Sequence, residues 1–297
     1  MNNTEFEIKL NEYRNILETS LTKRTDQPGY KNNRVCDAIK YSLLGGGKRV
    51  RGVLTLAFCD ALSGTYEQAV DFACAAEMVH CYSLIHDDLP CMDNDDYRRG
   101  KLSCHKKFGE ATAVLAGDGL LTLAFETMVH SCKVFDDMEL ALEGIGIMSS
   151  SAGVLGMIGG QIADIQNENR NMSFNELLVM QDKKTGALIK ASCCLGIVAA
   201  GGDVEKFALA GEYGTALGLA FQITDDILDV TSDKETLGKA VNKDKARGKF
   251  NFVSEMGVEE AKKTAEGLTG EAIKTLGRLE NSEFLIMFTK SLLERQN

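Results

Sequence analysis

The sequence predicts an all-α protein, and two observations support that fold class. Apolar side chains recur at helical spacing along nearly the whole chain, whereas the alternation typical of a half-buried strand is scarce. Only two of the 297 residues are proline, Pro28 and Pro90, and proline interrupts helices because it lacks a backbone donor. No repeat, low-complexity tract or linker divides the chain. We therefore expect residues 1–297 to form one domain, packed as a helical bundle.

Each expected helix ends where glycine or proline interrupts the apolar spacing. Pro28-Gly29 closes the first helix, Gly45-Gly46-Gly47 the second, and Ser63-Gly64 the third. The long fourth helix must end near Pro90, because the residue before a proline disfavours the helical region. Residues 231–249 are rich in Lys, Asp and Gly and predict a mobile loop. The expected helices cover 4–21, 32–44, 49–62, 66–88, 109–132, 136–165, 174–200, 204–230, 258–276 and 281–295.

Charge and composition exclude several classes of protein. A formal net charge of −10 argues against nucleic-acid binding, which needs a basic face to displace counterions from phosphates. The N-terminus lacks the apolar core of a signal peptide, and no stretch approaches the roughly 20 apolar residues needed to span a bilayer. Nine cysteines without paired spacing indicate reduced thiols. The sequence thus predicts a cytoplasmic protein without a membrane span.

Two aspartate-rich motifs stand at the ends of long apolar helices. The first is a DDxxxxD pattern, Asp87-Asp88 with Asp93, and the second is a DDxxD pattern, Asp225-Asp226 with Asp229. Neighbouring carboxylates repel one another, so a cation usually offsets their cost. Carboxylate oxygens favour hard cations such as magnesium, which bridges to substrate phosphates. Acidic residues can also cluster on solvated helix ends, but that explanation suits one motif better than two.

Basic side chains accompany the acidic motifs. Three glycines precede Lys48-Arg49-Val50-Arg51, a combination suited to an anionic head group, although a glycine cap before a helix would look the same. The spacing is not that of a Walker loop. Arg98-Arg99 follows the first motif, and Lys183-Lys184 interrupts an apolar helix. His80 lies two helical turns before Asp87, where a histidine is more often a core residue than a ligand. Further lysines, which are usually solvated in a loop, follow the second motif at Lys239, Lys243 and Lys249.

These segments closely resemble the motifs of bacterial-type trans-prenyl diphosphate synthases. The matching stretches keep the family's order from about residue 40 to 250, which makes the resemblance specific. One departure is Gly52, which stands where a proline commonly follows the arginine. The stretches are Gly46–Arg51, Glu77–Lys101, Gly159–Asp164, Lys184–Gly186 and Phe221–Asp226.

The resemblance implies a homodimer of helical subunits, each with a deep central cavity lined by the two motifs. Three Mg²⁺ ions would hold an allylic diphosphate between Asp87, Asp93 and Asp225, with Asp88 near or on the metals. Arg98, Lys184 and Lys239 would grip the same diphosphate, and Lys249 would join the substrate-binding residues. Isopentenyl diphosphate would lie on Lys48, Arg51, His80 and Arg99.

The implied reaction needs no Ser–His or Cys–His arrangement. Metals and cations would stabilise the departing diphosphate, which leaves an allylic carbocation. Thr185 and Gln222 would offer oxygen dipoles beside that cation. The double bond of isopentenyl diphosphate would attack it, and the released diphosphate would remove the proton.

Product length is expected to depend on Tyr82. This residue lies five positions before Asp87, about 7.5 Å along a helix that rises 1.5 Å per residue. In the family, an aromatic residue there, with two extra residues inside the acidic motif, resembles a farnesyl-type synthase. The alternative is that Tyr82 simply packs in the core.

Other functions remain open at this point. The nearest is a synthase that stops at geranyl or continues to geranylgeranyl diphosphate. A terpene cyclase or head-to-head condensing enzyme also uses acidic motifs, but a cyclase needs no second diphosphate site such as the Lys48–Arg51 segment. A catalytically silent regulatory subunit is a third possibility, against which both complete motifs argue.

Overall fold

The computed structural model describes residues 1–135, 137–167, 172–231 and 250–293, and it confirms the all-α expectation. The strands within these residues are β1 (Tyr97–Arg98) and β2 (Lys101–Leu102), which form a two-residue antiparallel pair just after the first acidic motif. The α-helices are α1 (Asn3–Thr25), α2 (Arg34–Leu43), α3 (Val50–Ala61), α4 (Tyr66–Asp87), α5 (Cys104–Phe108), α6 (Glu110–His130), α7 (Met138–Ala152), α8 (Met157–Gln166), α9 (Phe174–Gln181), α10 (Ala187–Ala199), α11 (Val204–Thr231), α14 (Phe252–Met256), α15 (Val258–Leu276) and α16 (Glu283–Leu293). Single turns of 3₁₀-helix cover Pro28–Tyr30 and Ser131–Lys133, and a π-helical turn covers Asp182–Gly186.

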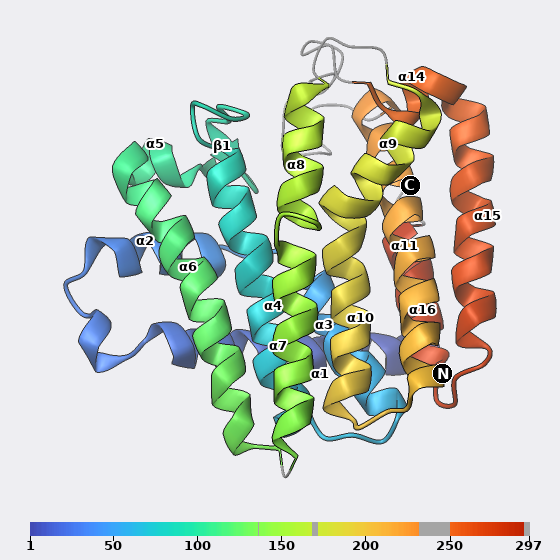
Figure 1. The fold of residues 1–297 in the computed structure, drawn as a ribbon, viewed down its shortest axis with the longest axis horizontal. Helices are drawn as coiled ribbons and strands as arrows, with labels where there is room; N and C mark the ends of the chain where they lie inside the picture. Colours follow the sequence, from blue (N-terminus) through green and yellow to red (C-terminus); the bar gives the residue numbers. More distant parts are fainter. Residues whose placement is uncertain (136, 168–171, 232–249, 294–297) are drawn as a thin grey trace.

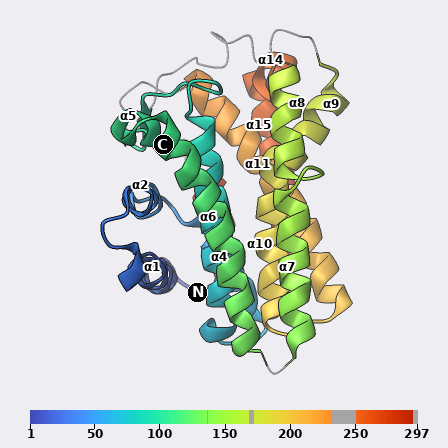
Figure 2. The same cartoon turned by 60° about the vertical axis from the view of Figure 1, so that its left-hand side comes forward.

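The long helices lie side by side as a bundle, and α1 crosses them near one side (Figures 1 and 2). Helix α4 occupies the interior, where it contacts α3, α6 and α10. Helix α11 packs between α10 and α15. The acidic motifs at the C-terminal ends of α4 and α11 lie toward the same end of the bundle (Figure 1).

Local sequence explains where α4 begins and ends. Thr65 and Gln68 form a capping box at its start, in which the Thr65 backbone N–H donates to the Gln68 side chain at 2.8 Å. The helix ends at Asp87, as expected for a chain that reaches Pro90 three residues later. The last residue of α4 is therefore the first aspartate of the DDxxxxD motif.

Two expected helices are interrupted. The range 136–165 was expected to be continuous, but α7 ends at Ala152 and α8 begins at Met157. Val154 and Leu155 continue the apolar sequence pattern across this break, but in the structure they lie in the turn and are 75% and 77% exposed. The range 174–200 contains the π-helical turn Asp182–Gly186 between α9 and α10. The expected loop at 231–249 lies outside the described residues except for Thr231, which ends α11.

By length and composition alone, two stretches could cross a membrane, Glu110–Lys133 and Met138–Gln166. The statement that no stretch approaches this requirement was therefore too strong. Core helices of soluble proteins pass the same test, and the second stretch is interrupted between α7 and α8. These helices belong to the bundle and give only weak evidence for a span. All nine cysteines are free thiols, as their spacing predicts.

Two glycines of α7 provide a test of the packing between α7 and α4. A Cβ at Gly144 would lie 2.4 Å from the Phe72 ring, whereas a Cβ at Gly146 would meet nothing within 4 Å. Gly144→Ala should lower the free energy of unfolding by about 1–3 kcal/mol through overpacking. Gly146→Ala should leave it unchanged or raise it by up to about 1 kcal/mol through helix propensity. Urea unfolding measures both, and equal effects would contradict this packing.

Candidate active site

Two cavities meet beside the C-terminal half of α4. One measures about 530 Å³ and the other about 340 Å³. Both are lined by Arg51, His80, Leu84 and Thr185, so they form neighbouring compartments of one site. Each acidic motif contributes to a different compartment, since Asp87 lines the larger cavity and Asp225 lines the smaller one.

The larger cavity is apolar over most of its wall. Helix α4 contributes Tyr82 and His86. The apolar residues that line this cavity from the first motif, α6 and α8 are Met92, Leu121, Met157, Ile158, Ile162 and Ile165. Asp87, Gln161 and Lys184 line it as well. Such a compartment suits a hydrocarbon chain attached to a charged group.

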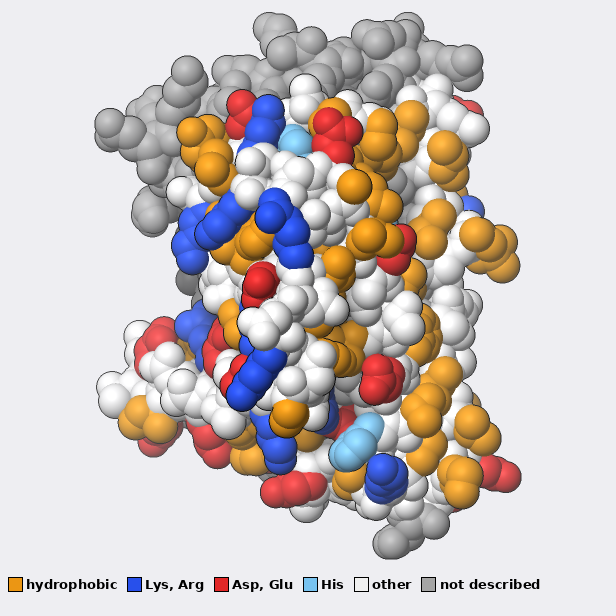
Figure 3. All heavy atoms as spheres, turned by 90° about the vertical axis from the view of Figure 1, so that its left-hand side faces the viewer, with side chains coloured by type: hydrophobic (Ala, Val, Ile, Leu, Met, Phe, Trp, Pro, Cys, Tyr) orange, Lys and Arg blue, Asp and Glu red, His pale blue; other side chains and the backbone are white. Residues whose placement is uncertain are grey.

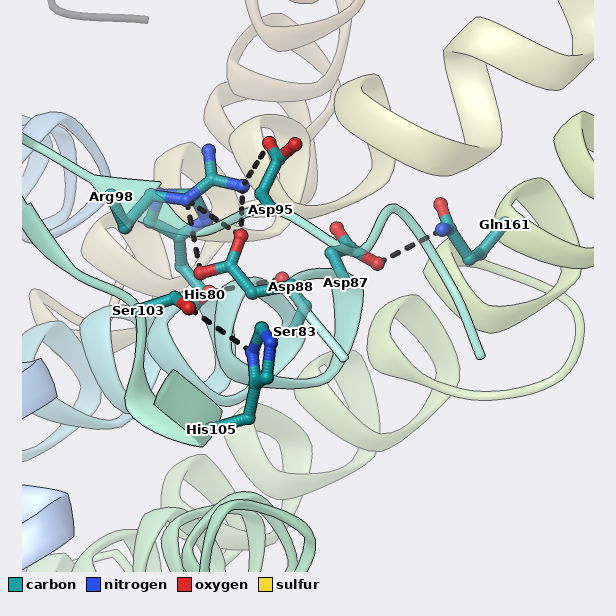
Figure 4. A network of polar contacts seen from close by, with 9 residues as sticks. All are labelled: His80, Ser83, Asp87, Asp88, Asp95, Arg98, Ser103, His105 and Gln161. Carbon is teal, nitrogen blue, oxygen red and sulfur yellow. Dashed lines mark hydrogen bonds and ion pairs between the residues drawn. The ribbon is translucent and has the colours of Figure 1, made fainter. Parts of the chain in front are cut away.

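The first aspartate of the DDxxxxD motif is held beside the third. The backbone N–H of Asp93 donates to the carbonyl oxygen of Asp87 at 2.8 Å, which folds the intervening loop back onto the end of α4. Gln161 on α8 donates from Nε2 to Asp87 Oδ1 at 2.9 Å (Figure 4). Burial raises the pKa of Asp87 to about 6; Lys184 opposes this shift, and Asp93 adds to it. A carboxylate in this setting gains from a bound cation.

The second aspartate of the same motif faces another way. Asp88 is 2% exposed and accepts hydrogen bonds from Arg98 Nε at 3.0 and 3.3 Å. Figure 4 shows the two aspartates pointing apart, Asp87 toward Gln161 and Asp88 toward Arg98. Asp95 lies 3.7 Å from the same guanidinium. Asp88 therefore fixes Arg98, and through it the β1–β2 hairpin, against the end of α4.

The DDxxD motif on α11 divides in the same manner. Asp225 lines the smaller cavity, whereas Asp226 is only 3% exposed. Asp226 accepts a hydrogen bond from Gln222 Nε2 at 2.9 Å and another from the Phe252 backbone N–H at 3.0 Å. Phe252 is the first residue of α14. Asp226 thus ties the start of α14 to α11.

The π-helical turn explains why Lys184 interrupts an apolar helix. Gly160 on α8 has no room for a Cβ, which would lie 2.2 Å from the Lys184 backbone nitrogen. This close approach lets Asp164, one turn further along α8, accept a hydrogen bond from Lys184 Nζ at 2.7 Å. Thr185 Oγ1 donates to Gln222 Oε1 at 2.9 Å. The turn therefore presents Lys184 to the larger cavity and Thr185 to both, and π-helical turns occur frequently at functional sites.

The smaller cavity gathers most of the basic residues. Its lining includes Lys48, Arg49, Arg51, Arg98 and Arg99 together with His80. Burial and the neighbouring arginines lower the pKa of His80 well below its usual value, so this imidazole is neutral. Burial also lowers the pKa of Arg51, to about 10, and its Nε atom has no hydrogen-bond partner. The compartment is prepared for an anion with several oxygens.

The structure therefore brings together most of the residues that the sequence singled out. Lys239 and Lys249 lie outside the described residues. Gln161 and Asp164 were part of a matching stretch but had no expected role, because their partners Asp87 and Lys184 are far away in the sequence. In the described ranges, no group of three or more His, Cys, Asp or Glu side chains is already gathered around a metal position.

Comparison with known proteins identifies the family. A family model for polyprenyl synthetase matches residues 32–283. The chain belongs to the polyprenyl synthetase family. A dimethylallyltranstransferase from Fischerella ambigua (strain UTEX 1903) is 43% identical over 265 residues, which cover 89% of this chain and 75% of the relative. Geranylgeranyl pyrophosphate synthase 3 from Arabidopsis thaliana is 40% identical over 277 residues, with coverage of 92% and 77%.

Solved structures of this family share the whole fold. An FPP/GFPP synthase from Zymomonas mobilis aligns with a TM-score of 0.88 and 32% identity, covering 98% of this chain and all of that one. A geranyltransferase from Legionella pneumophila gives a TM-score of 0.89 at 29% identity, with coverage of 98% and 97%. The chain is thus a short-chain prenyltransferase with the isoprenoid synthase fold. The named relatives include both FPP and geranylgeranyl pyrophosphate synthases, so they leave the product length undecided.

The raised pKa of Asp87 means that its ionised carboxylate lowers the free energy of unfolding of the metal-free protein. Because the folded-state pKa of about 6 exceeds the ordinary value, stability is lost as pH rises through 6. Asp87→Asn should therefore stabilise the protein in EDTA at pH 8 by on the order of 1–2 kcal/mol, but hardly at pH 4. Thermal unfolding at the two pH values measures this, and an equal effect at both would contradict it.

Proposed function

We propose that this prenyltransferase condenses isopentenyl diphosphate head-to-tail with dimethylallyl or geranyl diphosphate, with the help of magnesium, and yields farnesyl diphosphate. The supporting observation is the pair of joined cavities between the two acidic motifs. The apolar cavity accommodates the hydrocarbon tail of the allylic substrate, and the basic cavity accommodates the diphosphate of the second substrate. Their shared wall would bring the two reacting carbons together.

The carboxylates that line the cavities fit magnesium. Asp87 on one side and Asp225 on the other line them, and Asp93 follows Asp87 in the first motif, where its backbone N–H bonds to the Asp87 carbonyl oxygen. All three offer oxygen ligands, which this hard cation prefers. Three ions per site would be shared between these residues and the allylic diphosphate. When bound, they would neutralise the diphosphate and assist its departure. By the family resemblance Asp88 would lie near or on the metals, and its carboxylate also holds Arg98.

The other residues act on charge and position. Lys184, aligned by Asp164, donates to the allylic diphosphate together with Arg98. Thr185 and Gln222, hydrogen-bonded to each other, direct their oxygen dipoles toward the carbocation without attacking it. The double bond of isopentenyl diphosphate attacks the carbocation and forms the new carbon–carbon bond, and the released diphosphate removes a proton from the resulting cation. By the family resemblance, Lys239 and Lys249, which lie outside the described residues, would also contact substrate.

The second diphosphate would bind to Lys48, Arg51 and Arg99. His80, neutral in this setting, would donate one hydrogen bond from its ring. These residues separate the proposed function from that of a terpene cyclase, which has no second diphosphate to bind. The complete set of cavity-lining aspartates and cations likewise favours an active enzyme over a silent regulatory subunit.

Tyr82 would set the product length. Its side chain lines the apolar cavity, is 5% exposed and packs edge-to-face on His86, with the ring centroids 5.8 Å apart. An aromatic ring at this depth blocks a tail that grows along α4. This observation favours farnesyl over geranylgeranyl diphosphate, although relatives with the longer product share more than a third of the sequence.

The chain would act as one catalytic domain in a homodimer. Large apolar side chains are exposed along α6, α7, α8 and the adjoining turn, and Figure 3 shows apolar side chains gathered along its right-hand edge. An apolar face of this extent marks an interaction surface. Among soluble homo-oligomers the two-fold symmetric dimer is the commonest, so a second copy of this chain would cover the face. Its members include Val114, Leu115, Val129, Met138, Leu142, Val154, Leu155 and Ile158.

A product assay tests the proposed reaction. With magnesium, isopentenyl diphosphate and geranyl diphosphate, the wild-type chain should yield a fifteen-carbon product, and EDTA should abolish turnover. Asp87→Ala and Asp225→Ala should each lower kcat by about 10²–10³-fold through the loss of electrostatic stabilisation. Glu259→Ala, whose side chain is 85% exposed, is the control and should match wild type. Turnover that survives EDTA, or a product formed without isopentenyl diphosphate, would rule the proposal out.

A second assay tests the role of Tyr82. Tyr82→Ala opens the end of the apolar cavity, so the main product should shift from fifteen to twenty or more carbons. Tyr82→Phe keeps the ring and should keep the wild-type product, which makes it the matched control. Chromatography of the dephosphorylated products measures both. Products from Tyr82→Ala no longer than those of wild type would show that Tyr82 is only a core residue.

A further inference from the structure

We propose that Glu77 is a positioning residue for the site of the second diphosphate, an inference that rests on the proposed function of the smaller cavity. Glu77 lies on α4, one helical turn before His80, and lines that cavity. Its carboxylate is 3% exposed. A carboxylate so far from water is stable only with close partners, and its partners belong to the segment that carries Lys48 and Arg51.

The first partner is the start of α3. Glu77 Oε1 accepts a hydrogen bond from the backbone N–H of Gly52 at 3.0 Å. Gly52 is in the first turn of α3, whose N–H groups have no partner within the helix. The carboxylate of α4 thus ties down the turn that contains Arg51.

A side chain at position 52 would displace Leu17. A Cβ there would lie 2.7 Å from Leu17 Cδ2 of α1 and 3.2 Å from Glu77 Cγ. Leu17 is fully buried and fills the space where a side chain would otherwise stand. The glycine that departs from the family pattern therefore has a physical role, because it allows α1 and Glu77 to close around the N–H group.

The second partner is Arg49. Glu77 Oε2 lies 3.5 Å from a terminal nitrogen of Arg49. The same guanidinium donates to Glu18 Oε1 of α1 at 2.6 Å and to the Leu43 carbonyl oxygen at the end of α2 at 2.7 Å. Its side chain is only 2% exposed, and its backbone is left-handed with φ 54°. Arg49 therefore links three helices and is not available to substrate.

Arg51 differs from Arg49 in this respect. Its Nε atom is buried without a hydrogen-bond partner, and it lines both cavities. Burial and Arg99 lower the pKa of Arg51, whereas the negative charge of Glu77 is the largest influence that raises it. Glu77 thus has two effects on one site: it fixes the backbone on both sides of Val50 and helps keep Arg51 charged for an incoming anion.

Steady-state kinetics with each substrate varied in turn tests this role. Glu77→Ala should raise KM for isopentenyl diphosphate about tenfold or more, equivalent to the loss of a buried charge-assisted contact. KM for geranyl diphosphate and kcat should change less than about threefold. Glu77→Gln keeps an acceptor for the Gly52 N–H but loses the charge, so its effect should be smaller and in the same direction. Glu67→Gln, exposed in the first turn of α4, is the control and should resemble wild type.

Glu18→Ala is a second variant that tests the same network if Glu77→Ala does not fold. It releases Arg49 from its other carboxylate at a partly exposed position and should raise KM for isopentenyl diphosphate by a few fold. If neither Glu77→Gln nor Glu18→Ala alters that KM, or if the KM of both substrates rises equally, the role proposed for Glu77 is wrong. Failure of the wild-type chain to use isopentenyl diphosphate would instead overturn the proposed function itself.

Discussion

Two adjacent aspartates on an α-helix point about 100° apart, because the helix has 3.6 residues per turn. In this structure the two members of each Asp-Asp pair face different surroundings. In each motif the first aspartate lines a cavity and the second is buried with a donor of its own. Asp88 accepts hydrogen bonds from Arg98, and Asp226 accepts them from the Phe252 N–H and from Gln222. The repulsion within each pair is thereby limited, and each pair fixes the segment that follows it.

Several basic side chains of the site are likewise each held by a carboxylate partner. Lys184 is aligned by Asp164, Arg98 by Asp88, and Arg49 by Glu18 and Glu77. Their carboxylate partners are themselves held on α1, α4 and α8. Charges fixed in this manner need little rearrangement when a charged substrate arrives, which is how preorganised sites stabilise a leaving group. The bundle thus supports the site by orienting charged groups as much as by enclosing a cavity.

Much of this arrangement could be predicted from the sequence. Apolar spacing gave the helices, and Pro90 gave the end of α4 at Asp87. The break at Gly153–Gly156 was missed because Val154 and Leu155 continue the apolar pattern while pointing to the surface. The π-helical turn and the pairs Gln161–Asp87 and Asp164–Lys184 depend on contacts between distant segments, which spacing along one helix does not reveal. The hydrogen bonds between Arg98 and Asp88 could not be predicted from helical spacing either.

The division of labour within the Asp-Asp pairs is tested most directly by the thermal shift that magnesium with inorganic diphosphate produces in alanine variants of the four residues. Asp87→Ala and Asp225→Ala should lose the shift without lowering the Tm of the ligand-free protein. Asp88→Ala and Asp226→Ala should lower the ligand-free Tm by roughly 3–10 °C and still show a shift. The account would be contradicted if Asp88→Ala and Asp226→Ala lost the shift at an unchanged ligand-free Tm.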